Sequence, residues 1–194
     1  VTTNNVSLRD AIQSIRNHGA SREPASSSFL LGDFDQLGFN YRLTDIQAAV
    51  GCVQMDRLDW ILKKRREVAE RYDKLLRNIT WIIPPSNNQV ALHAYQSYVT
   101  LFAPEKPTLL NIEKLTSRRN QLMQQLQDAG IASRPGTQSV PTQKWYVQKY
   151  GYHPTDFPKA YVAEQVSLAL PLYPQLTAEE QEYVIEVLGK SFSY

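Results

Sequence analysis

The sequence predicts an α/β or α+β fold in which helices pack against a small sheet. Segments with the apolar spacing of helices alternate with short segments rich in aromatic and β-branched residues, and the longest helical segments come first. The chain has 194 residues, of which 42% are hydrophobic and 21% charged. That composition is typical of a globular protein with one domain, or one domain and part of another.

The N-terminal part predicts one helix followed by a long loop. Residues 1–3 are expected to end a strand whose turn is Asn4-Asn5. Ser7 is expected to cap a helix that ends at His18-Gly19. The apolar stripe of this helix consists of Leu8, Ala11, Ile12 and Ile15. Residues 20–36 are rich in serine and contain a proline, which indicates a long loop of a kind that often has a function.

The rest of the chain is organised around residues 37–50, LGFNYRLTDIQAAV. Gly38 suits a sharp turn, and Asn40 and Arg42 then place two donor-rich side chains just before a predicted helix. The free N–H groups of a helix start, together with an amide and a guanidinium, favour the binding of an anion. On spacing alone, an ordinary helix cap preceded by two solvated polar side chains is the simpler interpretation.

A long helical block should follow, from Asp45 to about Arg77, with room for a break. Thr44 and Gln47 have the spacing of a capping box, which predicts the start at Asp45. The apolar stripe consists of Ile46, Ala49, Val50, Val53, Leu58, Ile61, Leu62, Val68, Tyr72, Leu75 and Leu76. Cys52 falls within this pattern and is expected to be a small buried apolar residue.

The remaining chain predicts short strands separated by helices. The expected strands are 94–102, 131–134 and 168–173, and the expected helices are 118–129, 144–150 and 158–166, with Gly130 and Gly151 as stops. Thr177 and Glu180 form a second capping box, which predicts a last helix. The buried face of that helix is expected to carry Tyr183, Val184, Val187 and Leu188.

Composition excludes several classes of function. A net charge of +2 does not indicate a nucleic-acid partner, and the basic run 63–66 is expected to be a solvated helix face with acidic neighbours. No apolar run approaches the roughly 20 residues of a membrane span. His93 and His153 lack partners at ligand spacing, so no metal site is expected. A single cysteine fits a reducing, cytoplasmic setting.

The string GFNYRLTDIQAA, continuing through VGCVQMDRLDWILKKRREVAERY, closely resembles the G-x-N-x-R segment of the DegT/StrS-type sugar aminotransferases. SLRDAIQSIRNHGA, AYQSYVTLF and the stretch from GIASRPGTQSV to EEQEYVIEVL also resemble segments of that family, in the same order. The resemblance therefore covers essentially the whole chain. It implies the C-terminal small domain of a fold-type I aminotransferase that depends on pyridoxal phosphate.

The resemblance also implies that the main chemistry lies elsewhere. Family members hold the cofactor as a Schiff base on a lysine of the large domain, upstream of the segment with which this sequence begins. The first lysine here is Lys63, within a charged helical run that offers no desolvation. The sequence starts VTTNN, without a methionine, and reads like the middle of a longer protein. We therefore expect residues 1–36 to be a remnant of the large cofactor domain with its active-site loop. Residues 37–194 should be the small domain, and the chain alone should be inactive, with no catalytic residue.

Four site residues follow from the family position. Asn40 would donate its amide to the cofactor phosphate of the neighbouring subunit of a homodimer with shared active sites, and Arg42 would lie near the phosphate or the acidic donor. His18 and Arg134 are the candidates for binding substrate. Some relatives carry histidines where this chain has residues 136–141, GTQSVP, and that difference bears on sugar preference.

The function implied is the transfer of an amino group, with glutamate as a typical donor, to a keto-sugar nucleotide, as in polysaccharide biosynthesis. A second reading is a sugar dehydratase of the same fold that uses pyridoxal or pyridoxamine phosphate and has histidine in place of the lysine. A third is a non-catalytic dimerisation module. The lysine that separates these readings is expected upstream of Val1.

Overall fold

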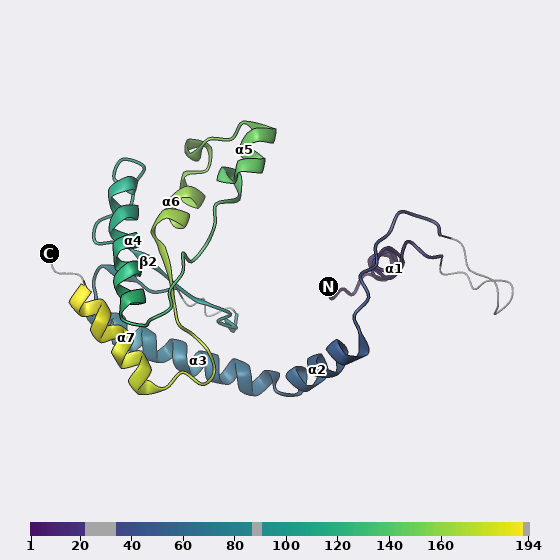
Figure 1. Ribbon diagram of the computed structural model, residues 1–194, viewed down its shortest axis with the longest axis horizontal. Helices are drawn as coiled ribbons and strands as arrows, with labels where there is room; N and C mark the ends of the chain where they lie inside the picture. The colour runs from purple at the N-terminus through teal and green to yellow at the C-terminus, as the bar shows by residue number, and fades with distance from the viewer. Residues whose placement is uncertain (22–33, 87–90, 192–194) are drawn as a thin grey trace. The chain divides into compact units, whose positions relative to one another are not determined.

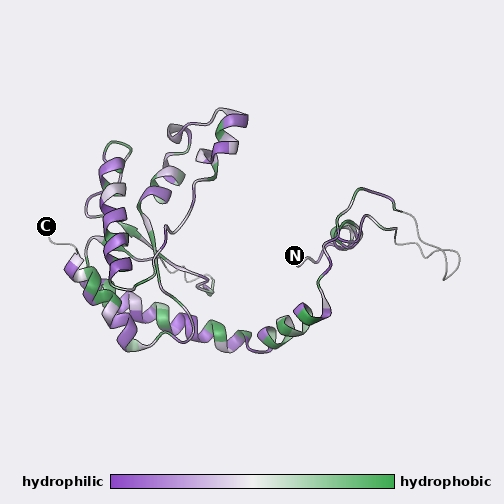
Figure 2. Ribbon diagram, viewed as in Figure 1, coloured by the Kyte–Doolittle hydropathy of each residue, from purple (hydrophilic) through white to green (hydrophobic). Residues whose placement is uncertain are grey.

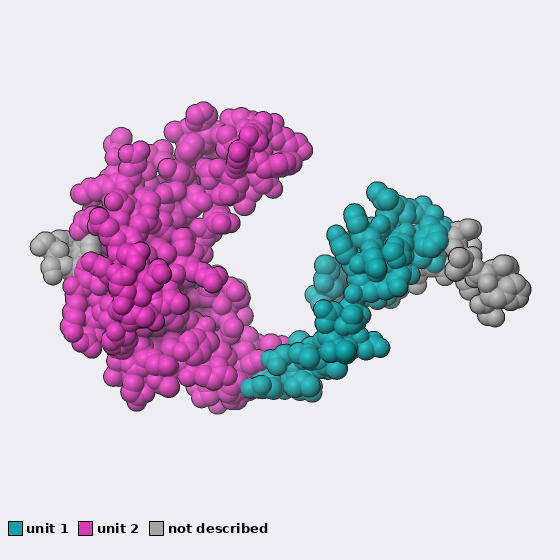
Figure 3. Space-filling view, in the orientation of Figure 1, with its two compact units in different colours: residues 1–57 teal, residues 58–194 magenta. Residues whose placement is uncertain are grey.

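The computed structural model describes residues 1–21, 34–86 and 91–191, and most of the expected loop 20–36 lies outside them. The chain forms two compact units, residues 1–57 and residues 58–194 (Figure 3). The expected assignment of residues 1–36 and 37–194 to the relatives' two domains stays a prediction.

The first unit contains helices α1 (Val6–Ile15) and α2 (Asp45–Asp56). Asn5 caps α1, because its side-chain oxygen accepts a hydrogen bond from the Leu8 amide at 3.0 Å. The expectation that Ser7 is the cap was therefore wrong, as was the strand at residues 1–3, which have no regular structure. The start of α2 is confirmed: the Gln47 amide donates to Thr44 Oγ1 at 3.3 Å, and the Thr44 amide donates to Gln47 Oε1 at 3.1 Å.

The second unit consists of helices packed on a three-stranded antiparallel sheet (Figure 1). Its helices are α3 (Leu58–Leu75), α4 (Ile112–Asp128), α5 (Lys144–Tyr150), α6 (Pro158–Val166) and α7 (Ala178–Ser191). Its strands are β1 (Ile82–Ile83), β2 (Tyr98–Phe102) and β3 (Ser167–Leu170), and β2 lies in the middle. Short 3-10 turns are η1 (Leu76–Asn78), η2 (Val140–Thr142) and η3 (Pro154–Asp156). The mixed fold with a small sheet is thus the one expected.

Side chains of alternate residues of β2 are buried, and they form the centre of the core. Tyr98, Thr100 and Phe102 are fully buried, as period-two alternation requires of a strand. Helices α3, α4 and α7 contribute Tyr72, Leu115, Leu122, Leu126, Val184 and Leu188 to the same cluster. Figure 2 shows hydrophobic positions interspersed with hydrophilic ones along helices α3 and α7. Among the described residues, every buried hydrophobic side chain of the core therefore lies between residues 58 and 191.

Several sequence expectations on burial were wrong. Cys52 is exposed, and no described side chain of α2 is buried. Tyr183 is also exposed, although Val184 and Leu188 of the same helix are buried. Periodicity gave the apolar faces of these helices, but whether a face is covered depends on partners that periodicity does not specify.

The basic run on α3 is more than a solvated face. One terminal nitrogen of Arg65 donates to the backbone oxygens of Tyr95 and Gln96 at 2.8 and 2.9 Å, and Arg66 Nε donates to that of His93 at 3.1 Å. These bonds fix the turn before β2, where Tyr95 has a left-handed backbone with φ of 45°. Within the described part of the chain, no helix is long and apolar enough to cross a membrane.

Candidate functional site

The expected site residues of the first unit lie where α1 ends. The last carbonyl groups of a helix have no partner within the helix. Here residues 39–41 run beside them as an extended segment: the Phe39 amide donates to the Ile15 oxygen at 2.6 Å, and the Tyr41 amide donates to the Arg16 oxygen at 2.9 Å. The His18 amide donates in return to the Phe39 oxygen at 3.0 Å. The end of α1 and the G-x-N-x-R segment thus form one structure.

Two glycines allow the two backbones to approach this closely. A Cβ on Gly38 would lie 2.0 Å from the Gly19 nitrogen, and a Cβ on Gly19 would lie 1.7 Å from the Gln36 oxygen. Gly19 also has φ of +79°, which glycine adopts without strain. The sequence predicted that Gly38 forms a turn with a backbone angle that other residues avoid, and this was wrong, because Gly38 has no positive φ and is needed for space. Its role as the contact point with the end of α1 depends on residues 19 positions away.

The same contact brings three of the four expected site residues into one small structure. Asn40 pairs with Asn17 in an isolated antiparallel bridge, and Arg42 Nε donates to Asn17 Oδ1 at 3.0 Å. His18, which follows Asn17, has a left-handed backbone with φ of 62°. Such a conformation is uncommon outside glycine and is often found at functional sites. Asn17 therefore links all three, and the sequence analysis had not singled it out.

The exposed groups of this structure suit an anion. Asn40 and Arg42 are exposed, and within the described residues the side-chain amide of Asn40 has no hydrogen-bond partner. The bond to Asn17 orients the Arg42 guanidinium through Nε, so its terminal nitrogens remain available as a fork for a phosphate or carboxylate. The N-terminus of α2 is less suitable, because the capping box uses the Gln47 amide and the Asp45 carboxylate stands in the first turn.

Arg134, the fourth expected site residue, belongs to the second unit. Its backbone pairs with Ala169 of β3 through two hydrogen bonds, from the Ala169 amide to the Arg134 oxygen at 2.8 Å and from the Arg134 amide to the Ala169 oxygen at 3.4 Å. The short strand expected at 131–134 is reduced to this single bridge. The Arg134 side chain is exposed.

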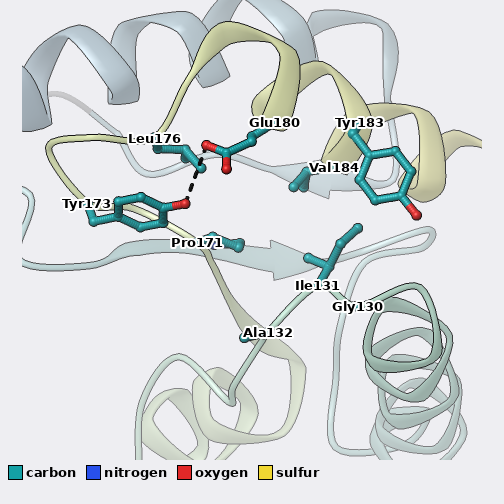
Figure 4. A pocket seen from close by; sticks show the side chains of 9 residues that line it. All are labelled: Gly130, Ile131, Ala132, Pro171, Tyr173, Leu176, Glu180, Tyr183 and Val184. Carbon is teal, nitrogen blue, oxygen red and sulfur yellow. Dashed lines mark hydrogen bonds between the residues drawn. The ribbon is translucent and has the colours of Figure 1, made fainter.

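A pocket of about 350 Å³ lies beside the start of α7, and sequence reasoning did not find it (Figure 4). Its floor is apolar, and the Tyr173 hydroxyl donates to Glu180 Oε2 at 3.4 Å. Partial burial and the Glu180 carboxylate raise the pKa of Tyr173. The lining residues are Gly130, Ile131, Ala132, Pro171, Tyr173, Leu176, Glu180, Tyr183 and Val184. None of the expected site residues lies in it.

No lysine of the chain has the environment of a Schiff-base nucleophile. All nine lysines lie in the described ranges, and each is exposed except Lys64, which is partly buried and paired with Glu67 at 2.7 Å. A Schiff-base lysine must be desolvated to lose its proton near neutral pH, and none of these exposed or ion-paired side chains is. The described residues likewise contain no group of three or more His, Cys, Asp or Glu side chains that could hold a metal ion.

The sequence of residues 1–189 matches the sequence model of the DegT/DnrJ/EryC1/StrS aminotransferase family. GDP-perosamine synthase of Escherichia coli O157:H7 is 28% identical over 162 residues, which are 82% of this chain and 39% of that protein. The PLP-form structure of Spr1654 from Streptococcus pneumoniae is 26% identical with a TM-score of 0.80, covering 98% of this chain and 46% of that one.

The fold also matches PseC of Helicobacter pylori, an aminotransferase of pseudoaminic acid biosynthesis. The TM-score is 0.83 over 98% of this chain and 47% of that one, at 21% identity, which shows the fold alone. The chain spans about half the length of the curated relatives it matches, 49% of one and 48% of another.

Proposed function

Since the chain belongs to the DegT/DnrJ/EryC1/StrS aminotransferase family, we propose that it forms part of an enzyme that transfers an amino group to a keto-sugar nucleotide. The donor is glutamate or a similar amino acid, and the cofactor is pyridoxal phosphate, which supplies the aldehyde that carries the amino group. The GDP in the name of GDP-perosamine synthase supports a nucleotide-linked sugar as the substrate class. The PLP-form of Spr1654 supports the cofactor.

The observation that carries the proposal is the position of Asn40 and Arg42 against Asn17. Both side chains are exposed donors on one short segment, and two close glycine contacts hold that segment in place. An amide and a guanidinium fork match the oxygens of a phosphate dianion. In the proposed enzyme, Asn40 and Arg42 hold the cofactor phosphate and His18 lies beside the substrate. The enzyme is a homodimer in which this segment serves the site of the partner subunit.

Arg134 is proposed to bind the diphosphate of the nucleotide sugar. The backbone of Arg134 is fixed by its pairing with Ala169, and its exposed guanidinium is a planar bidentate donor that matches the oxygens of a diphosphate. The loop that follows, residues 136–141, carries Thr, Gln and Ser but no histidine. Proton transfer by a histidine side chain is therefore not available from this loop.

The 194 residues alone are proposed to be inactive, because no lysine among them is desolvated. The test compares this chain with the full product of the gene that encodes it, each incubated with pyridoxal phosphate, glutamate and a series of keto-sugar nucleotides. The full product should yield an amino-sugar nucleotide and 2-oxoglutarate, as detected by mass spectrometry. The 194-residue chain should yield neither, and borohydride treatment should fix no cofactor on it in stoichiometric amounts.

Other outcomes would contradict the proposal. Loss of a sugar hydroxyl without amino transfer would favour a dehydratase, and the absence of any product from the full protein would favour a non-catalytic module. Stoichiometric labelling of one lysine in the 194-residue chain would show that its nucleophile lies within these residues.

A further inference from the structure

Ser167, the first residue of β3, is fully buried, and it is not among the residues that the family resemblance singles out. Its hydroxyl oxygen accepts two backbone hydrogen bonds, from the amides of Gly136 and Thr137, both at 3.1 Å. A single side-chain oxygen thus satisfies two successive amides of the segment that follows Arg134. Without it, both amides would lose their partner at a partly buried position.

The same segment has a second attachment to β3, at Ala169. Arg134 pairs with Ala169 through its backbone, as described above, so residues 134–137 are attached to β3 at two points two residues apart. Gly136 lies so close to the sheet that a Cβ there would be 2.3 Å from Val99 Cγ1 and 3.0 Å from the Ser167 Cβ. Glycine is needed at this position for space, because any side chain would push the segment away from Ser167.

The backbone of Ser167 is in turn fixed by a hydrogen bond from helix α4. A terminal nitrogen of Arg119 on α4 donates to the Ser167 backbone oxygen at 3.0 Å, and Arg119 is only 5% exposed. A buried guanidinium is costly, and its Nε has no partner among the described residues. The bond to Ser167 offsets part of that cost and fixes the first residue of β3 in place.

We propose that Ser167 is a positioning residue, which fixes the Arg134–Thr137 segment and thereby sets where the Arg134 guanidinium meets the diphosphate of the nucleotide sugar. This inference rests on the proposed function, because it gives Arg134 a substrate to bind. Ser167 acts through the backbone and does not touch the substrate. Loss of the Ser167 hydroxyl should therefore weaken the binding of the nucleotide sugar and leave the binding of the amino donor unchanged.

The test uses Ser167→Ala with Thr100→Val as the matched control. Thr100 is equally buried in the same sheet, and its hydroxyl donates to the Leu168 oxygen at 2.9 Å and not to residues 134–137. Amide hydrogen exchange in the 194-residue chain should accelerate about ten- to hundredfold at Gly136 and Thr137 in Ser167→Ala. In Thr100→Val these two amides should keep their protection. Gly136→Ala, which keeps the hydroxyl and displaces the segment, should give the same local acceleration as Ser167→Ala.

In the active enzyme, Ser167→Ala and Gly136→Ala should raise the KM for the nucleotide sugar about tenfold, with kcat and the KM for the amino donor little changed. Thr100→Val should change none of these, and Arg134→Ala should raise the nucleotide-sugar KM at least as much as Ser167→Ala. Unchanged exchange at Gly136 and Thr137 would overturn the proposal. So would an unchanged nucleotide-sugar KM in Ser167→Ala or in Arg134→Ala.

The two proposals fail in different ways. If the wild-type enzyme transfers amino groups but these KM values do not move, the positioning role is wrong and the proposed function stands. If the wild-type enzyme transfers none, the proposed function fails and the substrate part of this inference fails with it. The exchange experiment then still decides whether Ser167 anchors the segment.

Discussion

At the scale of single residues, two buried tyrosines show how one hydrogen bond changes the contribution of a hydroxyl group to stability. Tyr72 and Tyr98 are both fully buried, and their rings lie 5.0 Å apart. The Tyr98 hydroxyl donates to Asp73 Oδ1 at 2.5 Å, whereas the Tyr72 hydroxyl has no partner among the described residues. The same group is therefore stabilising in one position and costly in the other.

Tyr98→Phe should lower the free energy of unfolding by about 1.5–3 kcal/mol, the usual cost of losing a hydrogen bond to a charged group. Tyr72→Phe should be neutral or slightly stabilising, because it removes an unsatisfied hydroxyl. Urea denaturation of the two variants at pH 8 measures both values. Equal destabilisation by the two substitutions would contradict this account.

Both tyrosines should also make stability fall at high pH. Burial raises the pKa of each phenol above its usual value, and for Tyr98 the Asp73 carboxylate adds to the effect. Above a pH of about 10, the folded state therefore keeps a proton on each phenol that the unfolded state releases. Below that pH the ionisation of these groups leaves the free energy of unfolding unchanged, and above it the free energy of unfolding falls by about 1.4 kcal/mol per pH unit for each phenol. In the same measurement repeated at higher pH, Tyr72→Phe should lose stability less steeply than the wild type.

At the scale of elements, the helix caps and bounds that depend on local sequence were predicted well, whereas the burial of helix faces was not. The capping boxes Thr44/Gln47 and Thr177/Glu180 were found because all their partners lie within four residues, and both are present. Helices α5 and α6 were also predicted with their observed bounds. The two-residue strand β1 was missed, because Ile82 pairs with Phe102, which is 20 positions away and not visible in local spacing.

Helix α2 shows the limit most clearly. The apolar stripe was predicted, yet its Ile46, Val50 and Val53 are 80%, 60% and 56% exposed. These side chains lie on one face by their spacing of four and three residues. Exposed apolar stripes of this kind favour the binding of apolar partners.

The 194-residue chain should therefore bind a hydrophobic dye through α2, and Val50→Glu should reduce the fluorescence of the bound dye. Met55→Glu is the matched control, because Met55 is also exposed but lies on the opposite face by helical spacing. Both substitutions should change the free energy of unfolding by no more than about 0.5 kcal/mol, since neither side chain is buried. Equal loss of dye binding in the two variants would show that this face of α2 is not the surface involved.

At the scale of the whole molecule, the candidate site is assembled from residues that are distant in sequence. The clustering of His18, Asn40 and Arg42 around Asn17 depends on the glycine contacts between residues 19 and 38, which no spacing rule supplies. The family resemblance nominated three of these residues but not Asn17. The match to the family and to sugar aminotransferase folds supports the general function.

The central claim is that Asn40 holds the cofactor phosphate in the active site of the partner subunit. Asn40→Ala should weaken retention of pyridoxal phosphate about ten- to hundredfold, since a lost hydrogen bond to a charged group costs roughly 1.5–3 kcal/mol. The fold should survive, because Asn40 is exposed and precedes α2.

The most direct measurement is the activity of mixed dimers in the full enzyme, formed by co-expressing Asn40→Ala with a variant that lacks the Schiff-base lysine. Each variant alone should be inactive at limiting cofactor. A mixed dimer should recover one of its two sites, the one that combines an intact lysine with the other subunit's intact Asn40. If the mixed dimers show no activity while wild-type dimers prepared in the same way are active, Asn40 serves the site of its own subunit or none, and the account is wrong.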